Sequence, residues 1–414
     1  MPSSQSLSTV LTGGGGDTPN PTLLPVATMS SAPDTTAYDA LNIPALAAGG
    51  SYLDPVSGAK IYKLTDTSFP FASNPASGHD YADGGDEISL PWSGTKRTIH
   101  VLRLGTGFDH AMIDFDPSSG VSNPRVLSGT MDPNRDLCLT FSNNPATPYY
   151  CYICNADATV RRFDFRDNSE VTGGGWPWAS TGDVWLHQSR NDARFVILKT
   201  STGSTVVYEP STTTAKTHTD SNVDEPRMER DGRYVGLGMT TPNNGLNVYD
   251  WNTDTITWTY DPLTSATHTP FAHGANLRSI FLQSNWDGTP APGVYATIDP
   301  AVAQSDTNIG GAIVGDLLHG SGNWVQNAGN GQWGLFGKYG SPIDPGSTYV
   351  GRGGMVFARI SGGRYLLGHS YNTSNVYERF PFAKLSPDGR YALFTSNMNG
   401  QTRCDLFLAK VPTN

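Results

Sequence analysis

The sequence predicts an all-β fold: a seven-bladed β-propeller of four-stranded antiparallel blades, closed by an N-terminal strand that completes the last blade and preceded by an extended N-terminal arm. Three observations predict it. Short stretches alternate apolar and polar residues with the period of a strand, a turn-plus-strand unit recurs along the chain, and helix-forming surface residues are scarce. The chain holds 46 Gly and 29 Pro, and only 15% of it is charged, whereas exposed helices are dense in Lys, Glu and Arg.

The clearest unit lies near the C-terminus. Residues 382–386 are extended, and Pro387-Asp388-Gly389 is a turn, because Pro presets φ and Gly accepts a positive φ. Residues 391–395 alternate as a strand does, residues 397–401 form a polar turn, and residues 405–411 alternate again. A meander of about 30 residues cannot bury its own faces, so it requires neighbours of the same kind.

The same combination of a polar turn and a β-rich run occurs seven times. Its turns are anchored at Gly94, Asn134, Asp192, Asp231, Asn276, Asn330 and Asp388. The best matched pair is residues 230–235 and 387–392. Seven such turns at intervals of roughly 50 residues are typical of a propeller with seven blades.

The two ends of the chain are predicted to differ in character. Residues 1–45 are rich in Ser, Thr, Pro and Gly and predict a flexible arm, whereas residues 46–414 form the propeller. The last unit stops after its third strand, and residues 59–65 could supply the fourth strand from the front of the chain. Closure in this way removes two exposed sheet edges.

Charge and hydropathy exclude several classes of partner. The net charge is −10 and no run of Lys and Arg occurs, so we expect no nucleic-acid partner. No apolar run reaches the roughly 20 residues of a membrane helix, so we expect no membrane span. Residues 1–6 lack a basic and apolar start, so no signal peptide is visible; we nevertheless expect an extracellular or virion location.

Four cysteines are too few for a disulfide framework. If residues 136–142 and 148–153 form a hairpin that turns at Asn144-Pro145, Cys138 and Cys151 face each other. Two alternatives remain for this pair, a disulfide or two buried free thiols, and the free thiols are favoured. Cys151 and Cys154 form a C-x-x-C, but residues three apart on a strand point to opposite faces, which argues against a metal site.

Residues 385–397, Leu-Ser-Pro-Asp-Gly-Arg-Tyr-Ala-Leu-Phe-Thr-Ser-Asn, together with residues 405–411, resemble the TolB-type WD40-like propeller repeat. That repeat occurs in TolB, in the propellers of prolyl-oligopeptidase relatives and in oligogalacturonate-lyase-like polysaccharide lyases. The similarity is partial near residues 225–250, and elsewhere only the period agrees. It implies a propeller without selecting a function. No G-x-S-x-G element occurs, which excludes the peptidase branch.

In a propeller the inner strands run along a central channel, and ligands meet the residues just before each inner strand. The residues expected there to bind ligand are His79, Asp80, Glu225 and Gln326, with Asn323 beside the last. The residues expected to be catalytic, if the protein is an enzyme, are His187, His273, His369, Arg227, Arg379, Tyr81 and Tyr377.

The chemistry that this second set could perform is cleavage of a uronate polymer. Arg227 or Arg379 would neutralise the carboxylate, one of the three histidines would remove the C5 proton, and Tyr81 or Tyr377 would protonate the leaving oxygen. The resemblance to oligogalacturonate lyases further implies a divalent metal on histidines with a glutamine, which His273, His369 and Gln326 could supply. The alternative is that all these side chains cap turns and bond carbonyls.

Tryptophans and acidic turns also have two interpretations. The tryptophans concerned are Trp176, Trp178, Trp185, Trp251, Trp286, Trp324 and Trp333. They could stack on sugars or wedge between blades, and the core interpretation is favoured. The Asp-rich turns at 114–116 and 250–254 lack a D-x-D-x-D-G loop, so turn chemistry is favoured over Ca²⁺.

Two functions from different classes follow. The first is a non-catalytic propeller, a structural or recognition component that binds carbohydrate or protein in an extracellular or virion assembly, with residues 1–45 docked on a partner subunit. The second is a polysaccharide lyase or hydrolase that acts on uronic-acid-containing glycans at the channel mouth. The partners considered are protein subunits of an assembly, bound through residues 1–45, and acidic polysaccharide.

Overall fold

The computed structural model describes residues 24–25, 33–72, 79–81, 86–104, 108–135, 138–179, 184–199, 201–229, 232–239, 246–260, 354–359, 364–374, 381 and 383–412, and short strands between 271 and 336. Within these residues the only α-helix is α1 (Thr35–Ala40), and the 3₁₀ helices are η2 (Ile43–Ala45), η3 (Gly129–Met131) and η4 (Arg190–Asp192). The remaining regular structure is β, as the scarcity of helix-forming residues predicts. Within this part of the chain, no helix has the length and apolar character that crossing a membrane would require.

Three four-stranded sheets and one of five strands come from the first two thirds of the chain. One contains β4 (His79–Tyr81), β5 (Arg97–Leu104), β6 (Phe108–Asp116) and β7 (Gly120–Val126). The next contains β8 (Leu139–Phe141), β9 (Tyr150–Cys154), β10 (Thr159–Asp164) and β11 (Ser169–Glu170), with β12 (Trp178–Ala179) also paired to β10. The third sheet contains β13 (Val184–Gln188), β14 (Phe195–Lys199), β15 (Ser204–Glu209) and β16 (Thr214–Thr219). The fourth contains β17 (Val223–Met228), β18 (Tyr234–Met239), β19 (Leu246–Asp250) and β20 (Thr255–Tyr260).

The last third of the chain contributes two more large sheets and two strand pairs. The pairs are β21 (Phe271–His273) with β22 (Ser279–Phe281) and β23 (Ala296–Thr297) with β24 (Thr307–Asn308). One large sheet runs from β25 (Trp324–Val325) through β26 (Trp333–Phe336), β27 (Gly354–Arg359) and β28 (Arg364–His369) to β1 (Leu24–Pro25). The other runs from β29 (Lys384–Leu385) through β30 (Tyr391–Ser396), β31 (Asp405–Lys410) and β3 (Lys60–Lys63) to β2 (Ser51–Leu53).

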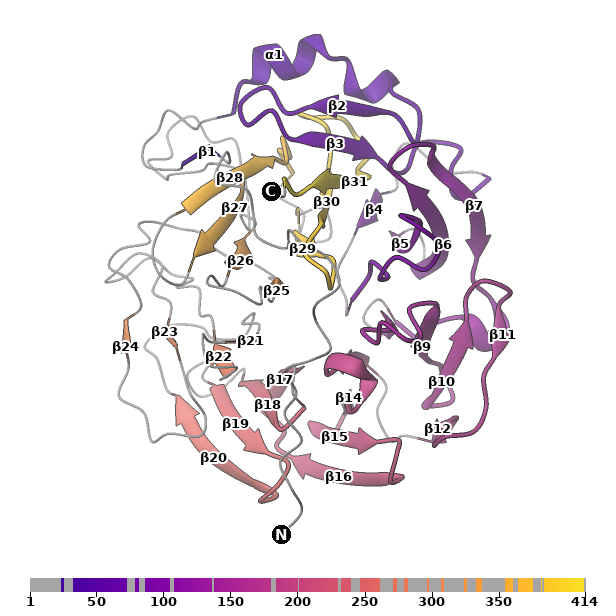
Figure 1. Ribbon diagram of the computed structural model, residues 1–414, viewed down its shortest axis with the longest axis vertical. Coiled ribbons are helices and arrows are strands. Elements are labelled where there is room, and N and C mark those ends of the chain that lie inside the picture. Colours follow the sequence, from indigo (N-terminus) through magenta and orange to yellow (C-terminus); the bar gives the residue numbers. More distant parts are fainter. Residues whose placement is uncertain are drawn as a thin grey trace.

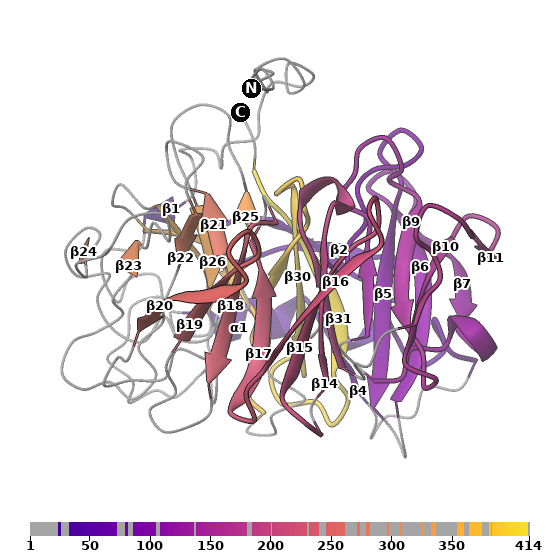
Figure 2. The same ribbon diagram turned by 90° about the horizontal axis from the view of Figure 1, so that it is seen from below.

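These sheets stand around a common centre. In Figure 1, β17, β25 and β29 lie near the middle, and β20 and β28 lie farther out. Figure 2 shows that the strands run roughly along the axis down which Figure 1 is viewed. The pairing between consecutive strands of each sheet is antiparallel, for example between β5 and β6 and between β30 and β31. The molecule is therefore a β-propeller built from antiparallel sheets, as the repeated units predict.

The sheet that contains the C-terminal strands also contains strands from the front of the chain. Strand β3 pairs antiparallel with β31, with Ile61 opposite Ala409, and so the predicted segment 59–65 does pair with the last strand. Residues before it also pack here, because Tyr38 and Ile43 are buried in one apolar cluster with Phe407. The described end of the predicted arm therefore lies against this sheet, and the domain boundary at residue 45 stays a prediction.

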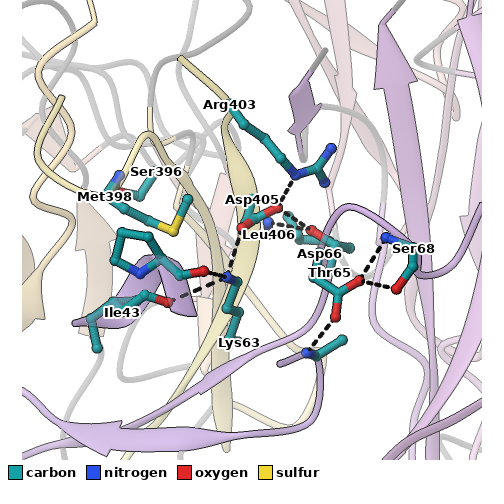
Figure 3. Close-up of polar contacts among 12 residues, drawn as sticks. Ile43, Lys63, Thr65, Asp66, Ser68, Ser396, Met398, Arg403, Asp405 and Leu406 are labelled. Carbon is teal, nitrogen blue, oxygen red and sulfur yellow. Dashed lines mark hydrogen bonds and ion pairs between the residues drawn. The ribbon is translucent and has the colours of Figure 1, made fainter. Parts of the chain in front are cut away.

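A buried ion pair joins these two chain segments (Figure 3). Lys63 Nζ lies 3.1 Å from Asp405 Oδ2, with both side chains buried. The same amino group donates to the carbonyl oxygens of Ile43 and Pro44, each at 3.3 Å. Asp405 Oδ1 accepts from Thr65 Oγ1 at 3.3 Å and from Arg403 Nε at 2.5 Å. One cluster of charges therefore fixes β3, β31 and η2 to one another.

Large aromatic side chains fill the space between neighbouring sheets. Trp176 and Trp178 are buried in a cluster with Tyr208, on which Trp178 stacks with ring centroids 4.3 Å apart. Trp185 and Trp251 are buried in the next cluster along the ring. The core interpretation is confirmed for these four tryptophans. Trp286 lies outside the described residues, and of Trp324 and Trp333 only the backbone is described.

The hairpin around the cysteines forms, but its predicted register is wrong. Cys151 lies opposite Phe141, and Leu139 lies opposite Ile153. The cause is the loop, which turns not tightly at Asn144-Pro145 but in two steps, with Thr147 N bonded to the Asn144 carbonyl and Tyr150 N bonded to the Thr147 carbonyl. Cys138 therefore does not face Cys151. All four cysteines are buried and none is in a disulfide.

Candidate functional site

Two of the predicted site residues come together on neighbouring inner strands. His187 lies on β13 and Arg227 on β17, and the Met228 main-chain N donates to His187 Nδ1 at 3.1 Å. The Arg227 guanidinium lies over the Trp185 ring, 4.3 Å from its centroid. We call Trp185, His187 and Arg227 the inner-strand site.

The backbone at this site departs from regular strand geometry. On β13 the register shifts between Val184, which lies opposite Leu198, and His187, which lies opposite Val196. Trp185 within this bulge has a φ of 64°, a conformation that costs a bulky residue energy and clusters at functional positions. A bulge of this kind re-aims side chains, and Trp185 consequently packs with residues of the β17–β20 sheet. Strand β17 has its own register shift, between Val223 and Glu225.

The hydrogen bond to His187 sets which ring nitrogen can act on a ligand. A main-chain N–H can only donate, so Nδ1 must accept from Met228. A neutral His187 therefore carries its proton on Nε2 and presents a donor there. Its acceptor nitrogen is already engaged, which does not suit the role of the base that removes the C5 proton.

Arg227 supplies positive charge beside an aromatic face. Its side chain is buried against the Trp185 indole, and a guanidinium in such a desolvated position attracts carboxylates strongly and can bind them through two parallel hydrogen bonds. Glu225 lies two residues earlier on the same strand, and its side chain is not described. The arrangement can bind an anion.

His369 lies elsewhere in the molecule. It is on β28, the fourth strand outward from β25, and is fully buried. Its main-chain N donates to Asp54 Oδ2 at 3.0 Å, and its Nδ1 lies 3.8 Å from the same oxygen. Burial raises the pKa of Asp54, but hydrogen bonds from His369 outweigh it, and the net pKa is lowered. His369 therefore holds the segment before β3 in place and does not join the inner-strand site.

The other predicted residues are described in part or not at all. His79, Asp80 and Tyr81 form β4, the first strand of its sheet, and His273 ends β21. The side chains of these four residues are not described. Gln326, Asn323, Tyr377 and Arg379 lie outside the described residues, so their roles stay predictions.

A buried charged cluster that was not predicted from the sequence lies between the β4–β7 sheet and β29. His100 Nε2 and His110 Nδ1 are 3.0 Å apart, and His100 Nδ1 lies 3.5 Å from Glu87 Oε1. Lys384 Nζ lies 3.8 Å from Glu87 Oε2. Burial, with Lys384 nearby, lowers the pKa of His100 to about 3, and burial beside His100 lowers that of His110 to about 3. The available signal was the diagonal placement of the two histidines on β5 and β6, where His100 lies opposite Met112 and His110 lies opposite Leu102.

A second network positions the end of β13. Gln188, the residue after His187, accepts from Thr140 Oγ1 at 2.7 Å through Oε1 and donates from Nε2 to the Phe141 carbonyl oxygen. Asn143 donates from Nδ2 to Asp86 Oδ2 at 2.7 Å and from its main-chain N to Asp192 Oδ1 at 2.9 Å. The network joins three sheets at their inner strands, so it holds His187 in a fixed place.

Nothing among the described residues has the form of a metal centre. No group of three His, Cys, Asp or Glu side chains in these ranges could hold an ion. The two rings of the histidine pair use a nitrogen each to bond one another. The Asp-rich turns use their carboxylates as turn residues do: Asp116 accepts from Ser118 N at 2.9 Å and Asp250 from Asn252 N at 2.8 Å.

No protein-family model matches the chain, and no curated protein matches its sequence. Solved structures do match. An oligogalacturonate lyase from Vibrio parahaemolyticus has a TM-score of 0.60 at 12% identity, over 88% of this chain and 96% of that one. An oligogalacturonate lyase in complex with manganese has a TM-score of 0.61 at 13% identity, over 89% and 99% of the two chains. The chain is thus a β-propeller that resembles oligogalacturonate lyase in fold.

Proposed function

We propose that the chain is a non-catalytic propeller that recognises an acidic carbohydrate at the inner-strand site. The observation that carries the proposal is the Arg227 guanidinium held 4.3 Å above the Trp185 ring on the adjacent inner strand. A uronic acid presents a carboxylate, and a desolvated guanidinium is the group that binds a carboxylate strongly. The buried Trp185 ring holds that guanidinium in place.

His187 completes this recognition set. With its Nδ1 bonded to Met228 N, the neutral ring carries its donor on Nε2, the group that would bond a carboxylate or ring oxygen of the ligand. The described side chains of β13 and β17 therefore supply a cation and a donor. Within the inner-strand site, the nitrogen that could take a proton, His187 Nδ1, already accepts from Met228 N, which favours binding over proton removal.

The test is calorimetric titration of the purified chain with oligogalacturonate, in parallel with a neutral oligosaccharide of equal length. Arg227→Ala should weaken binding of the acidic ligand by about 1.5–3 kcal/mol, the range of a hydrogen bond to a charged group, which is roughly a 10- to 100-fold rise in Kd. Arg233→Ala is the matched control, because Arg233 also lies over a ring, that of Tyr234, but pairs with Asp250 near the surface. Equal affinity of wild type and Arg227→Ala would refute the assignment.

A second candidate function is a lyase acting on uronate polymers, favoured by the fold shared with two oligogalacturonate lyases. Arg227 or Arg379 would neutralise the carboxylate, His273 would be the base, and Tyr81 or Tyr377 would be the acid; apart from Arg227, the side chains of these residues are not described. The described residues do not fit a metal. Appearance of the ultraviolet absorbance of a C4–C5 double bond in digests of polygalacturonate would establish this function and overturn the first.

We also infer the larger assembly. If the pairs β21–β22 and β23–β24 belong to one blade, the ring has seven blades, and β3 closes it by completing the blade of β29–β31. Of the predicted arm, residues 24–25 pair with β28, and Tyr38 and Ile43 pack in the cluster with Phe407. Residues 1–23 are therefore the part that would reach a partner subunit of an extracellular or virion structure. Light scattering of the full chain and of a chain lacking residues 1–23 tests this last proposal, because loss of that part should abolish association with that partner.

A further inference from the structure

Three cations lie over aromatic rings along one end of the β8–β11 sheet. All six side chains are accessible to a ligand, since one cation is exposed and the other five side chains are half-buried. Measured from the cation to the ring centroid, the pairs are Lys96 with Trp92 at 5.3 Å, Arg166 with Tyr149 at 3.5 Å and Arg162 with Tyr150 at 5.1 Å. We call these three cations and their rings the cation row.

The cation row is continuous. The rings of Tyr149 and Tyr150 have centroids 5.0 Å apart. The Trp92 ring lies 6.0 Å from the ring of Phe165, the residue before Arg166. In Figure 1 the sheet of β9 and β10 lies between the sheet of β5 and β6 and the sheet of β14 and β15. The row therefore runs from the turn before β5 across the end of the β8–β11 sheet.

The row lies at the end of the ring where the inner-strand site is. His187 and Arg227 are near the ends of β13 and β17. Tyr149 is the last residue of the loop that follows β8, and this loop bonds the residues that follow β13, because Asn143 N donates to Asp192 Oδ1 at 2.9 Å. A ligand at the inner-strand site that extends outward over this loop therefore reaches the row.

Two of the three cations are left without a carboxylate. Arg166 is paired with Asp164. Among the residues that the structure describes, neither Lys96 nor Arg162 forms an ion pair. Asp116 lies near Lys96, but its carboxylate bonds the turn that follows it. On a chain of net charge −10, cations that are held by rings and not neutralised provide a local attraction for the carboxylates of a ligand.

We propose that the cation row binds the outer units of an acidic polysaccharide whose first unit occupies the inner-strand site. This rests on the function proposed for that site. A polyuronate carries one carboxylate on each sugar unit, so it presents negative charges in a line, as Lys96, Arg166 and Arg162 present positive ones. Because the rings already restrain these side chains, less conformational entropy is lost on binding. The preferred ligand is therefore a chain of several uronate units.

Calorimetric titration with a galacturonate dimer and with a long oligogalacturonate tests the row. Wild type should bind the long ligand more tightly. Lys96→Gln and Arg162→Gln should each weaken its binding about 2- to 5-fold, the effect of a partly exposed ion pair. The affinity for the dimer, which is too short to leave the inner-strand site, should stay unchanged. Lys60→Gln is the matched control and should change neither affinity, because Lys60 lies 4.8 Å from the centroid of a ring, that of Tyr62, but on β3.

The possible failures are distinguishable. If both row variants bind the long ligand as wild type does while Arg227→Ala weakens it, the row is refuted and the inner-strand site stands. If only the row variants weaken it, the shared path is overturned. Absence of binding to either ligand refutes both proposals. A single-stranded oligonucleotide of equal charge that displaces the long ligand at a lower concentration overturns the ligand class.

Unchanged dimer affinity also shows that a variant is folded. Lys96 precedes β5 and Arg162 lies on β10, so these two substitutions act in different sheets. If one of them prevents folding, the other decides the result.

Discussion

At the scale of single residues, the buried charges of Lys63 and Asp405 decide how firmly the front of the chain is held. Both side chains are almost fully buried, and a buried charge that loses its partner is expensive because it remains desolvated. The Asp405 carboxylate pairs with Lys63 and accepts hydrogen bonds from Arg403 and Thr65. Its loss would leave two buried cations together, whereas loss of Lys63 leaves Asp405 still paired with Arg403.

Asp405→Ala should therefore destabilise the fold by about 3–5 kcal/mol, the cost of breaking a buried pair, and Lys63→Met by less. Urea unfolding followed by tryptophan fluorescence measures both. Asp109→Ala is the control, since its pair with Arg103 has an Asp side chain that is 48% exposed and surface pairs contribute about 0–1 kcal/mol. An Asp405→Ala variant as stable as Asp109→Ala would contradict this account.

The residue scale also shows what the sequence could and could not reveal about the site. Position along the repeat was enough to select His187 and Arg227, although both lie near the end of an inner strand, β13 or β17, and not just before one. The same reasoning selected His369, which lies on the fourth strand of its sheet and bonds Asp54, 315 residues away. A contact between such distant segments leaves no local pattern, and neither does the pairing of Glu87 with Lys384.

At the scale of elements, turn chemistry determines register, and register is where sequence reasoning was weakest. The strands β8 and β9 were recognisable from alternation, but the loop between them is longer than the Asn-Pro turn suggests, which moves Cys138 from Cys151 to Cys154. Because side chains alternate between faces, a shift by an odd number of residues changes the face that a strand presents. The order of strands was therefore predictable, while the opposing residues were not.

Two glycines with positive φ allow this turn argument to be tested. Gly203, between β14 and β15, has a φ of 63°, and a Cβ there would lie 2.0 Å from the Asp220 carbonyl oxygen. Gly94, in the turn before β5, has a φ of 62° and no atom within 4 Å of a Cβ. Gly94→Ala should cost about 1–2 kcal/mol for the left-handed backbone alone. Gly203→Ala should cost a further 1–3 kcal/mol, roughly, because backbone must move, as thermal unfolding can measure; equal costs would disprove the clash.

At the scale of the whole molecule, the ring depends on the seams between sheets, and one seam holds titratable groups. His100 and His110 of the β4–β7 sheet face Glu87 of their own sheet and Lys384 of β29, with Asp109 beside His110. The sequence predicted the sheets and the pairing of the two chain ends. It did not predict this seam, because Lys384 comes from β29, at the other end of the chain, and only the packing of β29 near the β4–β7 sheet brings it to Glu87.

Stability should consequently fall as the solution is acidified. Each histidine has a folded pKa of about 3 against an ordinary value of 6.5, so the unfolded chain takes up protons that the folded chain does not. The stabilisation is complete above about pH 6.5 and declines by up to about 1.4 kcal/mol per pH unit for each histidine as the pH falls toward 3. Asp192 acts oppositely, since burial raises its pKa to about 6. Its contribution to the free energy of unfolding is complete below about pH 4 and disappears as the pH rises through 6. Between those pH values it offsets the loss of stability caused by roughly one histidine.

A variant that keeps the polar contact without the titration separates this cause from general acid unfolding. His100→Gln with His110→Asn retains nitrogen or oxygen atoms near the positions of Nε2 and Nδ1, which are bonded in the wild type at 3.0 Å. Urea midpoints from pH 7.5 to 4.5 should decline less steeply in this double variant, and above pH 7 the difference between variant and wild type should stay constant with pH. Parallel slopes over the whole range would show that the histidine seam does not govern the acid sensitivity of the ring.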